Sequence, residues 1–540
     1  MLDLWYKNSI IYSLNVGTFA DANGDGVGDF AGLRSRLDHL NWLGVNCIWL
    51  QPFYPSPRLD YGYDVTDYYD INDRNGTFGE FVEFARQARE RGIRILIDLP
   101  ANHTSDQHPW FQQARSDPQS RYRDYYLWSE SEPAATDEGM AFPGFQERVW
   151  TYDETAEAWY FHRFYAHQPD LSIMNPMVRE EIKRVMGFWL ELGVAGFRMD
   201  ATHFLLDEDR PDGTSIRHYE FLGEFREFLS WRKGDAVMLA EANVEPDELA
   251  EFIGPTRMQM AFAFLMNQHL FLSLARGTAK PLAKMLSEQT DLGQTGQYAQ
   301  FLRNHDELDL GRLSEEERQD VFRAFAPEPE MQIFGRGIRR RLAPMLGGNR
   351  RRMELANSLM FSMPGSPVIY YGDEIGMGDD LSLEERWPVR TVMQWSGEPG
   401  GGFSSAPPAE FVHPVVEEGE FGAGVVNVEE QRRDPNSLLN WTRQLCDVRK
   451  SCPEVGWGRP ELVGVDNDAV LAHRYRWRGS HVLLVHNLHD RACRVSLDLM
   501  PEERGELVDL FGNQVYPPES GNSRTIELDG YGYRWFRARC

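Results

Sequence analysis

The chain has 540 residues, of which 42% are hydrophobic, and this predicts one large globular domain with one or two attached domains. It carries 56 Lys and Arg against 83 Asp and Glu, and the resulting formal charge of -27 would repel nucleic acid and anionic lipid. We therefore expect no nucleic acid and no membrane among its partners, and a neutral ligand or a cation instead.

The cysteines and the amino terminus give no sign of export. The five cysteines show no CxxC spacing, which predicts neither a disulfide framework nor a zinc site. The first residues have no basic region leading into an apolar core, and no apolar run approaches the roughly 20 residues that span a bilayer. We expect a cytoplasmic protein, and homo-oligomerisation is left open.

Residues 9–19 predict a strand, which leads into a loop suited to a hard cation. Oxygen ligands recur there at alternate positions with glycines between them, at Asp21, Asn23, Asp25, Val27 and Asp29. The twelfth position is Gly32 where an EF-hand has a chelating glutamate, which argues against an EF-hand. We expect a structural calcium ion, and the alternative is a loop held by Asx turns without metal.

Strand and helix patterns alternate along most of the chain. The predicted helices are 30–43, 77–91, 178–192 and one within 218–232, and the further predicted strands are 45–50, 93–99, 196–200, 237–239, 258–265, 299–303 and 367–371. Polar residues recur where these strands end. This pattern is typical of an α/β fold, a (β/α)8 TIM barrel with its active face at the carboxyl ends of the strands.

Two segments interrupt or follow the alternation. Residues 105–176 are rich in Trp, Tyr, Phe and Asp, which predicts an excursion domain inserted after the third strand. Short alternating strands after residue 455 predict a C-terminal antiparallel β-sandwich. The predicted organisation is a barrel of 1–104 and 177–455, an inserted domain of 105–176 and a sandwich of 456–540. A helix-like basic insert (337–352) and a loop (396–408) could cover the active face.

Three carboxylates end separate predicted strands: Asp200, Glu241 and Asp306. Arg198 lies two residues before Asp200, on the same face of its strand, and a neighbouring guanidinium favours an ionised carboxylate that can act as a nucleophile. A structural ion pair is the alternative for one such pair. Three carboxylates at equivalent strand ends favour a catalytic site instead.

The segments around these residues carry a family resemblance. DLPANH (98–103), GFRMD (196–200), EAN (241–243) and FLRNHD (301–306) resemble the four signature regions of the α-amylase superfamily, glycoside hydrolase family 13. The resemblance implies that Asp200 is the nucleophile, Glu241 the general acid/base and Asp306 the transition-state stabiliser. It also implies a glucose pocket, without an organic cofactor, lined by Asp60, Tyr63, His103, Arg198, His305 and Arg390.

This chemistry sets requirements for the site. A retaining glycosidase holds its two carboxyl groups roughly 5 to 5.5 Å apart, with a raised pKa on the acid and a low pKa on the nucleophile. Arg198 would lower the pKa of Asp200, and crowding would raise the pKa of Glu241. A pair of Asp60 and Arg390 would close the pocket beyond one glucose unit.

Within the superfamily the chain resembles the trehalose synthases. The segments that carry this are WFQQARSDP (110–118), HQPDL (167–171), LAEAN (239–243), FLRNHDEL (301–308), IRRRLAPML (338–346), YYGDEIGMGDD (370–380) and GYGYRWFRA (530–538). The chain departs from that group at Ser172, at Val244 to Pro246, within 262–267 and at Val392.

The resemblance implies that maltose and trehalose are isomerised through a β-glucosyl-aspartate intermediate, with maltose, trehalose and glucose as ligands. A hydrolase of short α-glucosides is the alternative with the same carboxylates. A non-catalytic sugar-binding protein is the alternative from another class, and the intact carboxylates argue against it.

Overall fold

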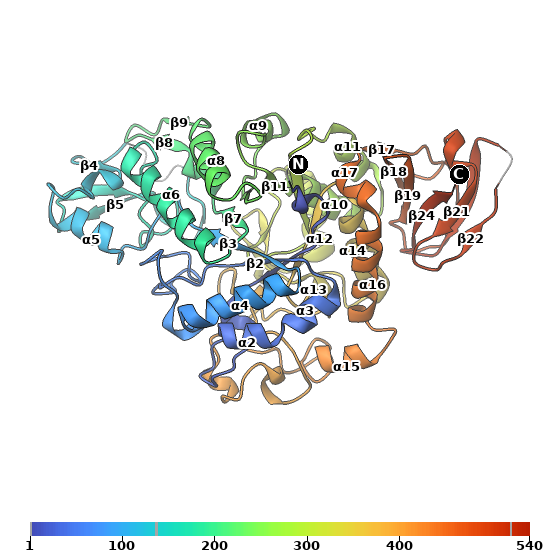
Figure 1. The fold of residues 1–540 in the computed structure, drawn as a ribbon, viewed down its shortest axis with the longest axis horizontal. Helices are drawn as coiled ribbons and strands as arrows, with labels where there is room; N and C mark the ends of the chain where they lie inside the picture. Colours follow the sequence, from blue (N-terminus) through green and yellow to red (C-terminus); the bar gives the residue numbers. More distant parts are fainter. Residues whose placement is uncertain (1–2, 135–138, 519–520, 540) are drawn as a thin grey trace.

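Eight parallel strands close into a barrel at the centre of the molecule (Figure 1). The structure is a computed structural model that describes residues 3–134, 139–518 and 521–539. The barrel strands are β1 (Ile11–Leu14), β2 (Cys47–Leu50), β3 (Arg94–Leu99), β7 (Gly196–Met199), β10 (Val237–Ala240), β11 (Met260–Phe262), β12 (Gln297–Phe301) and β16 (Ser366–Tyr370). Each strand pairs with its neighbour in this order, and β16 pairs with β1, which confirms the predicted (β/α)8 TIM barrel.

Helices between the strands cover the barrel. They are α2 (Phe30–Ser35), α3 (Leu37–Leu43), α4 (Phe78–Glu90), α6 (Pro176–Glu191), α8 (Phe221–Arg232), α9 (Pro246–Phe252), α10 (Phe264–Arg276), α11 (Lys280–Glu288), α12 (Glu315–Phe325), α14 (Arg350–Ser362) and α16 (Leu438–Ser451). The single helix predicted over 30–43 is divided at Arg36. The strand predicted over 9–19 ends at Leu14, because Asn15 caps a short helix, α1 (Val16–Phe19), by accepting a hydrogen bond from the Gly17 amide.

The strand that carries Asp200 needs a glycine at its start. A Cβ atom at Gly196 would come 2.2 Å from the carbonyl oxygen of Val237 on β10, so a larger residue could not pair there without moving a strand. All four residues of β7 are buried, as expected for a parallel strand covered on both faces. The GFRMD motif therefore fixes the backbone as well as the charged side chains.

An inserted segment and a C-terminal domain lie at opposite ends of the molecule in Figure 1. The insert contains α5 (Pro109–Ser116) and an antiparallel sheet of β4 (Trp128–Ser129), β6 (Ala158–Phe161) and β5 (Trp150–Asp153). The C-terminal sheets are antiparallel, as predicted, and contain β17 (Pro460–Leu462), β18 (Val470–Trp477), β19 (Ser480–Asn487), β20 (Cys493–Asp498), β21 (Glu506–Asp509), β22 (Val515–Tyr516), β23 (Ser523–Leu528) and β24 (Tyr533–Arg539).

Several short elements lie in the connections that follow the barrel strands. They are α7 (Thr202–Leu205), the hairpin of β8 (Asp207–Asp209) and β9 (Ser215–Arg217), the sheet of β13 (Leu308–Asp309), β15 (Gly337–Ile338) and β14 (Gln332–Ile333), and α13 (Leu342–Met345). Two further short helices, α15 (Val428–Arg433) and α17 (Pro453–Trp457), lie later in the chain. The basic insert predicted to be helix-like thus consists of a strand, a short helix and the start of α14.

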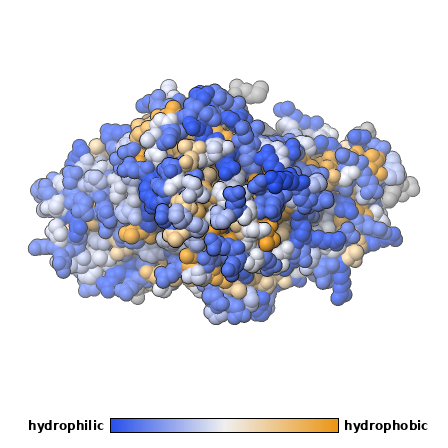
Figure 2. Space-filling view, turned by 90° about the horizontal axis from the view of Figure 1, so that it is seen from below, coloured by the Kyte–Doolittle hydropathy of each residue, from blue (hydrophilic) through white to orange (hydrophobic). Residues whose placement is uncertain are grey.

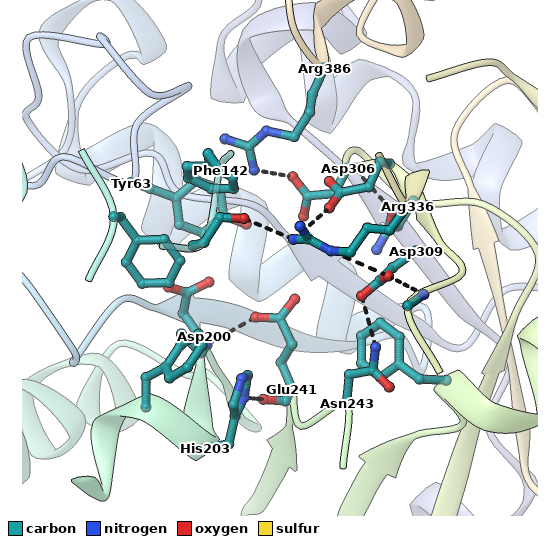
Figure 3. A pocket seen from close by; sticks show the side chains of 18 of the residues that line it. Tyr63, Phe142, Asp200, His203, Glu241, Asn243, Asp306, Asp309, Arg336 and Arg386 are labelled. Carbon is teal, nitrogen blue, oxygen red and sulfur yellow. Dashed lines mark hydrogen bonds and ion pairs between the residues drawn. The ribbon is translucent and has the colours of Figure 1, made fainter. Parts of the chain in front are cut away.

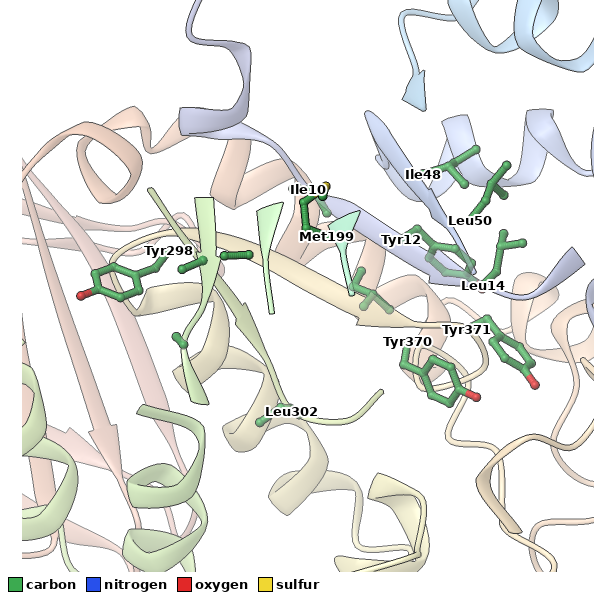
Figure 4. Close-up of a cluster of buried hydrophobic side chains, with 14 of the residues drawn as sticks. Ile10, Tyr12, Leu14, Ile48, Leu50, Met199, Tyr298, Leu302, Tyr370 and Tyr371 are labelled. Carbon is green, nitrogen blue, oxygen red and sulfur yellow. The ribbon is translucent and has the colours of Figure 1, made fainter. Parts of the chain in front are cut away.

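Apolar side chains from the barrel strands and the surrounding helices form one main core. Figure 4 shows part of it, where Ile10, Tyr12, Leu14, Ile48 and Leu50 pack together. The face in Figure 2 is mainly hydrophilic, with hydrophobic residues scattered over it. Among the described residues, no helix combines the length and the apolar composition that a bilayer crossing requires.

Candidate active site

The three predicted carboxylates meet in one pocket at the carboxyl ends of the barrel strands (Figure 3). Asp200 follows β7, Glu241 follows β10, and Asp306 lies on the loop after β12. The pocket has a volume of about 380 Å³, which is in the range of small-molecule sites. Of the predicted glucose-pocket residues, Asp60, Tyr63 and His103 also line it.

Arg198 is the charged centre behind these carboxylates. Its Nη1 atom lies 2.5 Å from Asp200 Oδ1 and 2.6 Å from Asp98 Oδ1, and its Nη2 atom pairs with Glu241. The Ala201 amide donates a second hydrogen bond to Glu241, at 2.9 Å. One buried guanidinium therefore contacts three carboxylates and holds Asp200 and Glu241 on neighbouring nitrogen atoms.

The predicted low pKa of Asp200 is wrong in direction. Burial raises the pKa of Asp200 above its usual value, and the charges of Glu241, Asp98 and Asp306 raise it further against the attraction of Arg198. Burial likewise raises the pKa of Asp98 to about 6. The sequence argument assumed one cation for one carboxylate, whereas here one cation serves three. Asp98 and Asp200 therefore retain a proton to higher pH than an isolated aspartate would.

Asp306 has a different environment. Burial alone would raise its pKa, but the charges of Arg386 and Arg390 outweigh burial and bring the pKa of Asp306 below its usual value. Burial also keeps His305 neutral by lowering its pKa, so the two arginines carry the positive charge at neutral pH. Their Nη atoms lie 2.7 and 3.1 Å from Asp306 Oδ1.

The predicted pair of Asp60 and Arg390 is wrong, because Arg386 takes the place of Arg390. Arg386 Nη2 donates to Asp60 Oδ1 at 2.8 Å, and the same guanidinium contacts Asp306 and Glu385. Arg390 is fully buried, donates to the His305 carbonyl oxygen and lies over the Tyr61 ring. Arg386 lines the pocket and closes one end of it, between Asp60 and Asp306.

Three predicted residues support the pocket from behind. Arg198, His305 and Arg390 are buried under its wall and contact the residues that face the cavity. Tyr63 links His305 to Asp98, because its hydroxyl lies 2.7 Å from His305 Nε2 and donates to Asp98 at 3.0 Å. The amide of the buried Gln168 lies 3.0 Å from Asp60 Oδ2 and 3.3 Å from His103 Nε2. Gln168 thereby joins the inserted segment to the glucose-pocket residues.

Further residues line the pocket that the sequence had not assigned to the site. They are aromatic, charged or polar: Phe142, Phe164, Phe204, Phe264, Asn243, Glu307, Asp309, Arg312 and Arg336. Three of these had a local signal, since Asn243 belongs to the EAN motif and Glu307 and Asp309 follow Asp306 directly. Arg386 and Arg336 had none, because long loops bring them to the pocket.

The positions where the chain departs from the trehalose synthases lie in different places. Phe264 lines the pocket, and Glu245 contacts the pocket residue Arg312, with 3.1 Å between Oε1 and Nη1. Asn267 is buried and donates to the Phe301 carbonyl oxygen at the end of β12. Val392 lies in a separate apolar cluster with Phe403. Phe264 and Glu245 are therefore at or beside the pocket, whereas Asn267 and Val392 are buried and do not line it.

The predicted calcium loop is held by its own amide groups. Asp21 accepts hydrogen bonds from the Gly24 and Gly26 amides, and Asp29 accepts from Ala22, Asn23 and Gly32. Among the described residues, no three His, Cys, Asp or Glu side chains converge as they would around a metal ion. These contacts are those of the Asx-turn alternative. The calcium ion stays a prediction of the sequence.

Comparison with known proteins gives the family. Residues 14–325 and 338–458 match the alpha amylase catalytic domain, and residues 479–537 match the sucrose hydrolase-like C-terminal domain. The chain is 42% identical to a trehalose synthase of Thermus thermophilus, over 99% of this chain and 55% of that protein, so it spans about half the length of that relative. It is 39% identical to a trehalose synthase of Pimelobacter sp. (strain R48), over 99% of this chain and 96% of that protein.

A solved structure agrees with this assignment. The α-amylase from H. orenii superposes with a TM-score of 0.80 at 28% identity, over 99% of this chain and 100% of that one. The family match covers well over half of the 540 residues, and it includes the strands and strand ends that carry Asp200, Glu241 and Asp306. The chain therefore belongs to the α-amylase family.

Proposed function

We propose that this chain isomerises maltose and trehalose by moving one glucosyl unit between two hydroxyl groups of a glucose molecule that stays bound. The observation that carries the proposal is a pocket lined by three carboxylates, by the ion pair of Asp60 and Arg386 and by further polar and aromatic residues. One end suits a terminal glucosyl unit, and the other leaves room for a second sugar. The two trehalose synthases at about 40% identity support the same reaction.

In the first step a carboxylate oxygen of Asp200 attacks C1 of the terminal glucosyl unit. The bond from C1 to O4 of the second glucose breaks, Glu241 gives its proton to that oxygen, and a β-glucosyl-aspartate ester forms. Arg198 contacts both carboxyl groups and so holds the nucleophile and the acid in place for this step. Asp306, kept ionised by Arg386 and Arg390, would accept hydrogen bonds from the glucosyl hydroxyls.

In the second step the retained glucose turns and presents its anomeric hydroxyl group. Glu241 removes the proton of that hydroxyl group. The hydroxyl oxygen attacks C1 of the glucosyl unit, and the bond from C1 to Asp200 breaks to give trehalose. Two inversions at C1 keep the α configuration. Water must stay out during the turn, because it competes for the same ester.

A hydrolase of short α-glucosides is the second candidate. It would use the same three carboxylates and differ in letting water reach the ester before the released glucose reacts. The likeness to the H. orenii α-amylase supports it. The two candidates differ in product, so the product decides between them.

The test is incubation with maltose, followed by NMR of all anomeric protons. We expect trehalose to accumulate while the total number of glycosidic bonds is nearly conserved. Release of two glucose molecules per maltose without trehalose would contradict the isomerase and support the hydrolase. Asp200→Asn, which keeps the side-chain size and removes the nucleophile, serves as the inactive control; turnover in that variant would contradict both candidates.

A further inference from the structure

The hairpin of β14 and β15 reaches across the pocket to the inserted segment. Residues 334–336 join its two strands, and Phe334 and Gly335 have φ of 56° and 67°, in the left-handed region that a phenylalanine adopts only at a cost. The Phe334 ring packs against Phe142 and Phe145 of the inserted segment, with centroid distances of 5.2 and 5.8 Å. This geometry places the next residue, Arg336, at the rim of the pocket.

Arg336 joins three parts of the pocket wall (Figure 3). Its Nη2 atom donates to the Ala141 carbonyl oxygen of the inserted segment at 2.8 Å. The same guanidinium lies 3.7 Å from Glu307 and 3.6 Å from Asp309, on the loop that carries Asp306. Asp309 in turn accepts a hydrogen bond from Asn243 at 2.8 Å, which links the end of β10 to this group.

Two glycines make room for this arrangement. A Cβ atom at Gly337 would come 2.6 Å from the Glu307 side chain, and one at Gly311 would come 3.2 Å from the Arg336 side chain. The hairpin and the loop after β12 are therefore in close contact, with the charged groups between them. Arg336 remains 27% exposed, so it faces the cavity as well as its partners.

Glu307 gives this side of the pocket an unusual polar group. Its side chain is 8% exposed, and the ion pair with Arg336 is long. Burial raises the pKa of Glu307 to about 7, with Arg386 opposing and Asp306 and Asp309 adding to the effect. A buried carboxyl without a close partner is suited to bind sugar hydroxyl groups that enter the pocket.

We propose that Arg336 is a positioning residue that holds the hairpin, the inserted segment and the Glu307 and Asp309 carboxyl groups together around the second glucose. By closing this side, Arg336 keeps the released glucose in place and delays water, so that transfer exceeds hydrolysis. This inference rests on the proposed function, because a released glucose must be retained for it to matter. Arg336 does not touch the reacting atoms, and it acts through the carboxyl groups and the wall that it holds.

The test compares wild type, Arg336→Gln and Arg336→Lys in two reactions. With maltose, the ratio of glucose released to trehalose formed is measured. With α-glucosyl fluoride, whose fluoride leaving group needs no second glucose, the rate of fluoride release is measured. Arg323→Gln is the matched control, because this exposed arginine on α12 pairs with Asp320 and lies outside the pocket.

We expect Arg336→Gln to raise the ratio of glucose to trehalose about tenfold, with fluoride release within about twofold of wild type. Arg336→Lys keeps the charge but lacks the planar guanidinium that can donate to two groups at once. Its ratio of glucose to trehalose should therefore lie between those of wild type and Arg336→Gln. A purely structural role would lower both products together and leave the ratio unchanged.

Two outcomes overturn the inference in distinguishable ways. If wild type makes trehalose and Arg336→Gln has the wild-type ratio, or loses fluoride release in parallel, the inference about Arg336 fails and the proposed function stands. If wild type itself makes glucose without trehalose, the proposed function fails and the role of Arg336 in retention fails with it.

Discussion

At the scale of single residues, the charge around each carboxylate decides what it can do. Arg198 is shared among Asp98, Asp200 and Glu241, whereas Asp306 contacts two arginines, Arg386 and Arg390. The positions of Asp200, Glu241 and Asp306 could be predicted from the sequence, because each follows a strand and strand ends meet in a barrel. The pKa of Asp200 could not, because it depends on how many neighbours share one guanidinium.

Arg386 gives the prediction at this scale. Arg386→Gln removes contacts to Asp60, Asp306 and Glu385 together, so we expect kcat/KM for maltose to fall about 100-fold, the effect of one or two charged hydrogen bonds. Arg386→Lys should recover part of the loss, since one ammonium group cannot bridge Asp60 and Asp306 as a guanidinium does. Steady-state kinetics on maltose measure both.

Arg390→Gln is the comparison for this prediction. Arg390 lies under the pocket wall. Arg390→Gln should therefore lower the melting temperature more than Arg386→Gln does, and should lower kcat/KM of the correctly folded enzyme less. An unchanged kcat/KM in Arg386→Gln would show that the contacts of Arg386 with Asp60 and Asp306 do not contribute to maltose binding or turnover.

At the scale of elements, strands were more predictable than loops. The strand beginning at Gly196 follows from a short apolar run between a helix and a polar end, and the structure has it at the expected residues. The segment 337–352 was expected to be a helix-like insert, but it begins with β15, which pairs with β14 in a hairpin. Contacts with Phe142 and Glu307, distant in sequence, decide its conformation.

The loop of residues 21–29 gives the prediction at this scale. If it binds a structural calcium ion, as its spacing of oxygen atoms predicts, chelation followed by dialysis should lower the melting temperature by several degrees, and added calcium should restore it. Asp25→Asn should weaken the response to calcium. A melting temperature that is the same with and without calcium would contradict the predicted ion. The loop would then be stabilised by the amide hydrogen bonds that Asp21 and Asp29 accept.

At the scale of the whole molecule, burial keeps many histidines neutral. Among the described residues, burial lowers the pKa of nine histidines: His39, His103, His108, His162, His203, His305, His413, His473 and His486. Below about pH 6.5 the unfolded chain binds protons at these sites and the folded chain does not, so acid favours unfolding. Ten carboxyl groups among the described residues, such as Glu374 with a pKa of about 7, have their pKa raised by burial and oppose this effect.

We therefore expect the contribution of the buried histidines to the free energy of unfolding to fall as the pH is lowered from 7.5 to 5.5. His486, on β19 of the C-terminal domain, provides the specific test, because it is buried, stacks on His473 and lies 3.0 Å from Ser358 of α14. His486→Gln should reduce the loss by about 1 kcal/mol, since one neutral histidine accounts for about 1.4 kcal/mol per pH unit below its unfolded pKa.

The measurement is urea denaturation at the two pH values. His489→Gln, which changes an exposed histidine two residues beyond β19, should leave the acid-dependent loss unchanged. Equal losses in wild type and His486→Gln would contradict the account of the buried histidines.

The central claim is that a glucosyl unit is carried on Asp200 while the second glucose waits in the pocket. The most direct measurement is to trap the ester with 5-fluoro-α-D-glucosyl fluoride, digest the protein and locate the added mass by mass spectrometry. The account predicts one fluoroglucosyl group on Asp200, and none after treatment of Asp200→Asn. An adduct on Glu241 or Asp306, or full activity without any adduct on Asp200, would contradict it.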